Sequence, residues 1–186
     1  MGNLAGAVIA ANRANDLCKN GDLDGAIQAY SSAFQIDPRI FNQALVVSPS
    51  FFFAGSERAE VNRRIGRYDK ALAELNHIIN LYSMHHTDAL ARIDRAWLYA
   101  TCPDPVLRNR KQAVADATAA CEIDSWDNRD YVGTLAAAFA EAGDFAKAIK
   151  FEEKAIRKAR HDGTKGAQER LALYQSHRPF RLEPAR

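Results

Sequence analysis

The chain has 186 residues, 47% hydrophobic and 26% charged, with a formal net charge of +2. This composition is ordinary for a soluble globular protein, and the length suffices for one domain with a continuous core. Acidic and basic residues are mixed along the chain, and no apolar run approaches the roughly 20 residues of a membrane span. Neither a nucleic acid nor a membrane is therefore predicted as a partner.

The apolar N-terminal stretch, 4–11, is short and lacks a basic flank. It predicts the start of a first helix rather than a secretory signal. The abrupt beginning is typical of a fragment of a longer chain. The compartment is left open: the cytoplasm is favoured, and the periplasm is the alternative if a signal peptide is missing from this fragment.

A block of fixed spacing then recurs around Gly21, Gly66 and Gly143, with one alanine five residues after each glycine and another seven residues before it. Each block predicts two helices joined by a turn, in which the glycine closes the first helix in the left-handed conformation. The alanines mark where the helix backbones come close. They form the pairs Ala14 with Ala26, Ala59 with Ala71, and Ala136 with Ala148.

Two further features accompany the blocks. Asp24, Asp69 and Asp144 are predicted near the starts of the second helices, where a carboxylate meets partial positive charge. An arginine precedes the first-helix alanine in three copies, at Arg13, Arg58 and Arg95.

The third copy, Ala96 to Ala113, lacks the turn glycine. Pro103 and Pro105 stand in its place, and each removes a backbone donor and fixes a backbone angle. The sequence therefore predicts a long loop from Thr101 to Arg110, with helix resuming by Lys111.

This pattern resembles the tetratricopeptide repeat of bacterial proteins, whose unit is about 34 residues. The matching positions are the first-helix alanines, the turn glycines and the second-helix alanines Ala26, Ala71, Ala113 and Ala148; a later small or apolar position also matches (Ala33, Ile78, Ala120, Ala155). The resemblance implies an all-α, right-handed solenoid of about four helix-turn-helix pairs with a C-terminal capping helix. The expected single domain, 1–186, divides into pairs at 4–38, 50–83, 88–124 and 128–160, with the capping helix and tail at 164–186.

Little in the sequence points to catalysis. It has no glycine-rich phosphate loop and no serine in a nucleophile elbow. The carboxylate pairs Glu152-Glu153 and Asp22/Asp24 are predicted to face solvent, and His85-His86 near Asp88 is interpreted as a polar loop rather than a metal site. Cys18, Cys102 and Cys121 are interpreted as free thiols. The predicted protein is not an enzyme and needs no cofactor or metal.

The resemblance implies instead a protein or peptide partner, because first helices line the concave groove of such arrays. The inner positions carried over are Ala11, Asn15, Cys18, Lys19, Phe53, Ser56, Glu60, Arg63, Arg64, Ile93, Trp97, Thr101, Gly133, Ala137 and Glu141. Among them, the predicted partner-binding residues are Asn15, Lys19, Glu60, Arg63, Arg64 and Trp97. Arginine offers a fork for a carboxylate, and tryptophan offers apolar area. The alternative is that these side chains only solubilise the surface or pack on neighbours.

Phe51-Phe52-Phe53 allows a second interpretation. Three consecutive aromatics on a helix spread around most of its circumference and cannot all face one core. Either the extra segment Ile40–Val47 covers them, or they form an exposed patch. The alternative function is therefore a structural subunit that forms a homo-oligomer through this region.

Overall fold

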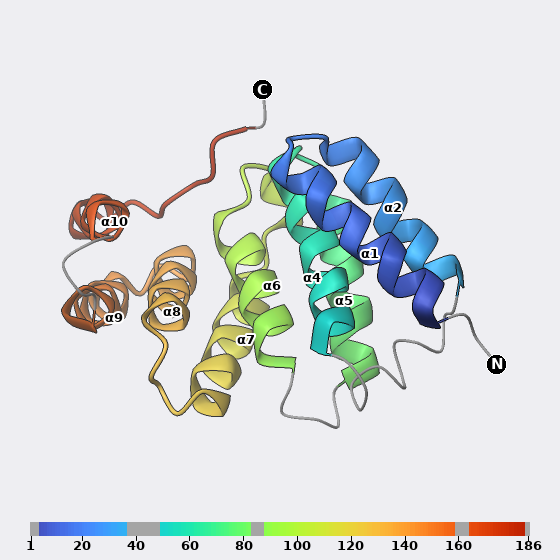
Figure 1. The fold of residues 1–186 in the computed structure, drawn as a ribbon. Helices are drawn as coiled ribbons and strands as arrows, with labels where there is room; N and C mark the ends of the chain where they lie inside the picture. Colours follow the sequence, from blue (N-terminus) through green and yellow to red (C-terminus); the bar gives the residue numbers. More distant parts are fainter. Residues whose placement is uncertain (1–3, 37–48, 83–87, 159–163, 185–186) are drawn as a thin grey trace. The chain divides into compact units, whose positions relative to one another are not determined.

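The computed structural model of the chain describes residues 4–36, 49–82, 88–158 and 164–184. In these residues every regular element is helical, which confirms the all-α prediction (Figure 1). Contacts divide the chain into two compact units, residues 1–81 and 82–184. The single domain over 1–186 stays a prediction. The expectations for Ile40–Val47 and His85-His86 fall outside the described residues, as do the side chains of Phe51 to Phe53.

Unit 1 contains α1 (Leu4–Lys19), α2 (Leu23–Ile36), α4 (Pro49–Arg64) and α5 (Tyr68–Tyr82). α1 packs along α2, and both contact α4. Ala14 and Ala26 are fully buried in the cluster between α1 and α2, together with Tyr30, and Val61 of α4 joins them. The small alanine side chains let the helix backbones approach closely, so the predicted helix contact of the first block is confirmed.

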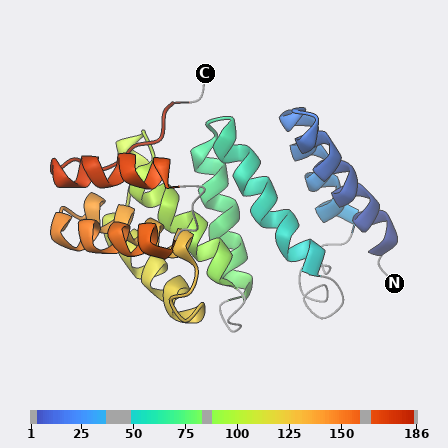
Figure 2. The same cartoon turned by 60° about the vertical axis from the view of Figure 1, so that its left-hand side comes forward.

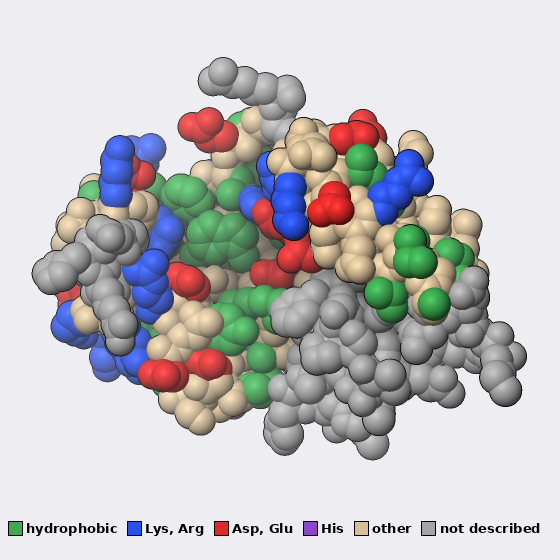
Figure 3. All heavy atoms as spheres, in the orientation of Figure 1, with side chains coloured by type: hydrophobic (Ala, Val, Ile, Leu, Met, Phe, Trp, Pro, Cys, Tyr) green, Lys and Arg blue, Asp and Glu red, His purple; other side chains and the backbone are tan. Residues whose placement is uncertain are grey.

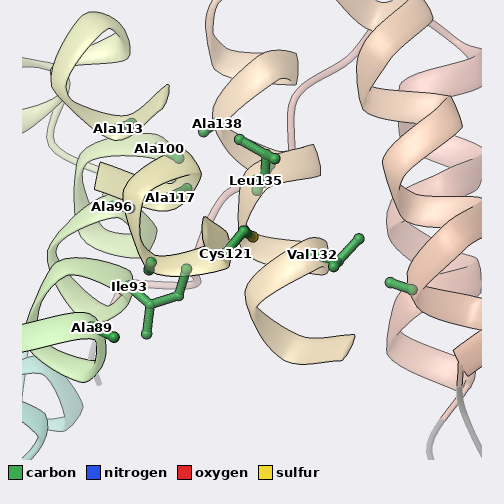
Figure 4. Packing of buried hydrophobic residues seen from close by; sticks show 13 residues of the cluster. Ala89, Ile93, Ala96, Ala100, Ala113, Ala117, Cys121, Val132, Leu135 and Ala138 are labelled. Carbon is green, nitrogen blue, oxygen red and sulfur yellow. The ribbon is translucent and has the colours of Figure 1, made fainter. Parts of the chain in front are cut away.

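Unit 2 contains α6 (Ala89–Thr101), the short 3₁₀ helix η2 (Pro105–Leu107), α7 (Arg110–Ile123), α8 (Arg129–Glu141), α9 (Phe145–Lys158) and α10 (Lys165–Gln175). α6 packs on α7 and α8, α8 packs on α9, and α9 packs on α10, seen as orange and red neighbours in Figure 2. Alanines of α6 and α7 meet Leu135 of α8 in one core (Figure 4). Ala113, Ala148 and Ala155 are buried, as the alanine pattern predicts.

The turn glycines adopt the predicted left-handed conformation, with φ of 83° at Gly21, 78° at Gly66 and 83° at Gly143. The aspartate directly after the glycine caps the next helix in two copies. Asp22 Oδ1 accepts from the Gly25 N–H at 2.9 Å, and Asp144 Oδ1 accepts from the Lys147 N–H at 3.1 Å. Capping in the first copy thus comes from Asp22, while Asp24 lies in the first turn of α2.

The proline loop of the third copy is confirmed. α6 ends at Thr101, Pro105 opens η2, and α7 begins at Arg110. Asp104 accepts from the Val106 N–H at 2.9 Å, and Asn109 caps α7 by accepting from the Gln112 N–H at 3.1 Å. Polar side chains thus satisfy backbone donors that the prolines and the broken helix leave without helical partners.

The recurring arginine forms an ion pair inside its own helix pair. Arg58 of α4 bonds to Glu74 of α5. Arg95 of α6 bonds to both oxygens of Asp116 of α7, at 2.7 and 2.8 Å. Glu74 and Asp116 each lie three residues after the second-helix alanine, so the two ion pairs occupy equivalent repeat positions.

The other two helix pairs lack this ion pair, the first because the acid is missing and the last because both charged residues are missing. Arg13 of α1 is exposed, and Ala29 takes the acid's place in α2. In α8 and α9 the positions hold Leu135 and Phe151, which pack in the core of unit 2. The arginine is therefore half-buried or buried where the acid is present, and it is exposed where the acid is missing.

Candidate functional site

The clearest candidate site lies where the C-terminal segment, residues 178–184, crosses unit 2. Beyond α10 the Arg178 N–H donates to the carbonyl of Leu173 at 2.9 Å, which closes the helix. Pro179 follows directly, and the residue before a proline is disfavoured in helix. The segment is therefore extended, and it leads from α10 toward α8 and α6 (Figure 1).

Three successive residues of this segment make three different kinds of contact. The Phe180 ring packs on Trp97 of α6, with ring centroids 5.7 Å apart. Arg181 donates to the Ala100 carbonyl at 3.1 Å and pairs with Glu141 of α8. The Leu182 N–H donates to the Thr101 carbonyl at 2.9 Å. An aromatic contact, a charge and a backbone hydrogen bond thus fix both the position and the register of the segment.

Glu141 is the electrostatic centre of the site. Its side chain is 14% exposed and also pairs with Arg108, whose Nε lies 3.3 Å from Oε1. Arg108 comes from the proline loop and donates to the Cys102 carbonyl at 3.0 Å. The loop therefore presents a cation that orients Glu141 toward the segment. A partly buried carboxylate held in this way favours a second cation, because charge-assisted hydrogen bonds are the stronger kind.

The α10 side of the site contradicts one prediction. Glu152 does not face solvent: it is fully buried, and Arg170 of α10 donates to its Oε1 from Nη2 at 2.7 Å. Burial raises the pKa of Glu152, and the Arg170 guanidinium opposes that rise. Arg170 also lies over the Trp97 ring, 5.7 Å from its centroid. The acid is accommodated in the core because a helix that follows later in the chain supplies its partner.

Two buried oxygens beside this pair have no hydrogen-bond partner among the described residues, namely Glu152 Oε2 and Tyr174 Oη. Burial raises the pKa of Tyr174, and the neighbouring Glu152 carboxylate raises it further. The polar groups under α10 are thus less completely satisfied than those around Glu141.

Several predicted inner positions are not displayed to solvent. Those that are buried are Ala11, Ser56, Ile93, Thr101, Gly133 and Ala137. Ile93 and Ala137 belong to the core of unit 2, and Ala11 belongs to that of unit 1. At Gly133 an added Cβ would lie 3.4 Å from Arg170 Nη2, so α10 covers this position. Trp97 is half-buried, not exposed, because Phe180 and Arg170 cover its ring.

The other five predicted partner-binding residues lie in unit 1. Asn15 Oδ1 accepts from the Tyr30 hydroxyl at 2.5 Å. Glu60 and Arg63 are brought together as a bidentate pair on α4, with both distances 2.5 Å. Lys19 and Arg64 are exposed. Trp97 belongs to unit 2, so the six residues are not assembled into one described site.

Unit 1 also contains a pocket of about 290 Å³ between α2, α4 and α5. Its charged lining is largely paired already, since Arg58 bonds to Glu74 and Arg67 lies 3.1 Å from Asp24. The Asn62 Oδ1 at this pocket has no hydrogen-bond partner among the described residues.

Sequence reasoning missed Phe180, Arg181 and Arg170 as parts of a site. The signal that could have found Phe180 and Arg181 is Pro179, which predicts an extended tail after the last helix. Arg170 lies within α10, and no local signal marks it. Figure 3 shows hydrophobic side chains gathered over α6 and α8, with acidic side chains beside them.

Within the described ranges, no group of three or more His, Cys, Asp or Glu side chains could hold a metal ion. No helix in the same ranges is long and apolar enough to cross a membrane. Neither a protein-family model nor a curated protein matches this chain.

Proposed function

We propose that the chain is a non-catalytic protein-interaction module that binds an extended peptide across the first helices of a tetratricopeptide-like solenoid. The observation that carries the proposal is the seating of residues 178–184 on α6 and α8. Trp97, Thr101 and Glu141 are inner positions of the predicted groove, and all three contact this segment. The surface already holds an extended stretch of polypeptide through contacts that a partner peptide would use.

The repeat architecture of the proposal has support within each unit. The left-handed glycines, the buried alanine pairs and the Arg–acid pairs recur at equivalent positions. Repeats of this kind stack to build long surfaces, and such surfaces usually serve binding. The right-handed arrangement of about four pairs remains part of the proposal.

The proposed site is centred on Trp97 and Glu141, with Arg108 in support. Asn15, Lys19, Glu60, Arg63 and Arg64 stay predicted partner-binding residues of unit 1, and the mutual pairing of Glu60 with Arg63 argues for a smaller role of those two. Self-association through Phe51 to Phe53 stays the alternative.

A peptide library tests the proposal without a known partner. Full-length chain and a full-length variant carrying Phe180→Ala and Arg181→Ala are immobilised and selected against random peptides of about 12 residues. We expect enriched peptides whose affinity falls about thirtyfold with Trp97→Ala, which corresponds to about 2 kcal/mol of binding free energy. Circular dichroism confirms that each variant is folded. Absence of any enriched peptide on both proteins, or enrichment that Trp97→Ala leaves intact, would refute peptide binding at this site.

A further inference from the structure

We infer that residues 178–184 are a built-in competitor at the peptide site, and that the partner is a segment of another protein in which an aromatic residue directly precedes an arginine. This inference rests on the proposed function and names the partner's chemistry. It is drawn from the contacts that the chain's own segment makes.

The chemistry of the site matches that pair of residues in order. The Trp97 ring meets the aromatic Phe180, and the next residue, Arg181, reaches the Glu141 carboxylate and the Ala100 carbonyl. The Thr101 carbonyl then accepts from the following N–H. Two carbonyls and a carboxylate are acceptors only, so the site selects donors and a positive charge. An acidic residue in place of the arginine would put two carboxylates face to face.

The contacts of the segment are exchangeable rather than permanent. The Arg181 side chain is 31% exposed, and its pair with Glu141 is reachable by water. The Phe180 ring packs on Trp97 and in the cluster of Tyr174, and Arg181 and Leu182 add hydrogen bonds to carbonyls of α6. α10 also packs directly on α9 and α8. The segment can therefore leave while α10 stays in place.

Tethering makes the segment an effective competitor despite modest contacts. A short linker gives an effective concentration of about a millimolar. If the free segment binds with a dissociation constant of about 100 µM, the site is occupied by the tethered segment about ten times more often than it is empty. A partner then binds about tenfold more weakly to the intact chain than to a chain whose own segment is disabled.

The test uses full-length chains and a fluorescent peptide, Arg-Pro-Phe-Arg-Leu-Glu-Pro, which copies residues 178–184. The opened variant carries Phe180→Ala and Arg181→Ala. Arg178→Ala is the matched control, since it removes an exposed arginine three positions before Arg181 in the same segment. Anisotropy titrations should show a dissociation constant of about 100 µM for the opened variant, and about tenfold weaker binding to wild type and to the control. Replacing the arginine after phenylalanine by glutamate in the peptide should abolish binding.

Each other outcome overturns a defined part of the inference. Equal binding to wild type and opened chain would refute competition by the segment. No binding to an opened chain that still enriches library peptides would refute the aromatic–arginine class, while leaving peptide binding intact. A wild-type dimer in light scattering that the peptide dissociates would assign the segment to exchange between copies and refute a heterologous partner. If the double variant does not fold, Arg181→Ala alone replaces it, with the same expected direction.

Discussion

Replacing Arg95 by leucine should destabilise unit 2 more than any other single charge removal in the repeat pattern. Asp116 is 1% exposed and accepts both of its strongest hydrogen bonds from Arg95. Without Arg95, the Asp116 carboxylate keeps a hydrogen bond from the Gln112 side chain at 2.9 Å, and the guanidinium of Arg92 lies 3.8 Å away. A buried carboxylate that loses its main partner costs about 3 kcal/mol or more, because its desolvation is no longer offset.

The chain itself supplies the matched control. Leu135 and Phe151 occupy the equivalent positions of α8 and α9. A variant with Arg95→Leu and Asp116→Phe therefore imports an apolar pair that this fold already contains. Replacing both members of a buried ion pair is often neutral, so the double variant should be more stable than Arg95→Leu alone.

Urea unfolding followed by tryptophan fluorescence measures the effect. Both tryptophans of the chain, Trp97 and Trp126, lie in unit 2, so the signal reports this unit. With an m value of about 2 kcal/mol/M, a loss of about 3 kcal/mol lowers the midpoint by about 1.5 M. A midpoint of Arg95→Leu within error of wild type would show that the pair does not hold α6 to α7. A double variant less stable than the single variant would refute the equivalence of the repeat positions.

Three further outcomes are expected. Ala148→Leu should overpack the contact with Ala136 and Tyr174 and cost about 1–3 kcal/mol, and a wild-type melting temperature would contradict the helix register. Gly143→Ala should cost about 1 kcal/mol through its φ of 83° alone, because an added Cβ meets nothing within 4 Å; unchanged stability would place the turn in another conformation. Glu152→Gln should remove a pH dependence of the free energy of unfolding. Because the pKa of Glu152 is raised in the folded chain, the protonated carboxyl stabilises the fold. This stabilisation is lost as the pH rises through the folded pKa. The stability of the glutamine variant relative to wild type should therefore increase from pH 4 to pH 7 in parallel urea titrations, and a decrease would show that the Arg170 pair outweighs burial.

The sequence predicted what is local. Gly143, the alanines and Pro103 act on the backbone within a turn or two, so their spacing is sufficient to place helices and turns. The arginine before the first-helix alanine was visible as a pattern. Its partner was not, because Asp116 lies 21 residues away on another helix.

The candidate site was predicted less well for the same reason. Glu152 was expected in solvent because an acid is rarely buried, and its partner Arg170 follows 18 residues later. Trp97 was expected to be exposed because nothing near it in sequence covers it. Phe180 covers it from the far end of unit 2, and no periodicity within a single helix predicts such a contact.

The bond from Arg181 to the Ala100 carbonyl joins residues 81 apart in the chain. In an open array each repeat touches only its neighbours, so its ends can fray one repeat at a time. Here the return of the segment to α6 closes a ring of contacts around α7, α8 and α9. While the segment is bound, loss of α10 should then be felt at α6, and hydrogen exchange at α6 should be slower than in the chain whose segment has left the site. Folding should also carry a late, slower phase, because the entropy of closing so long a loop comes before its contacts stabilise the chain.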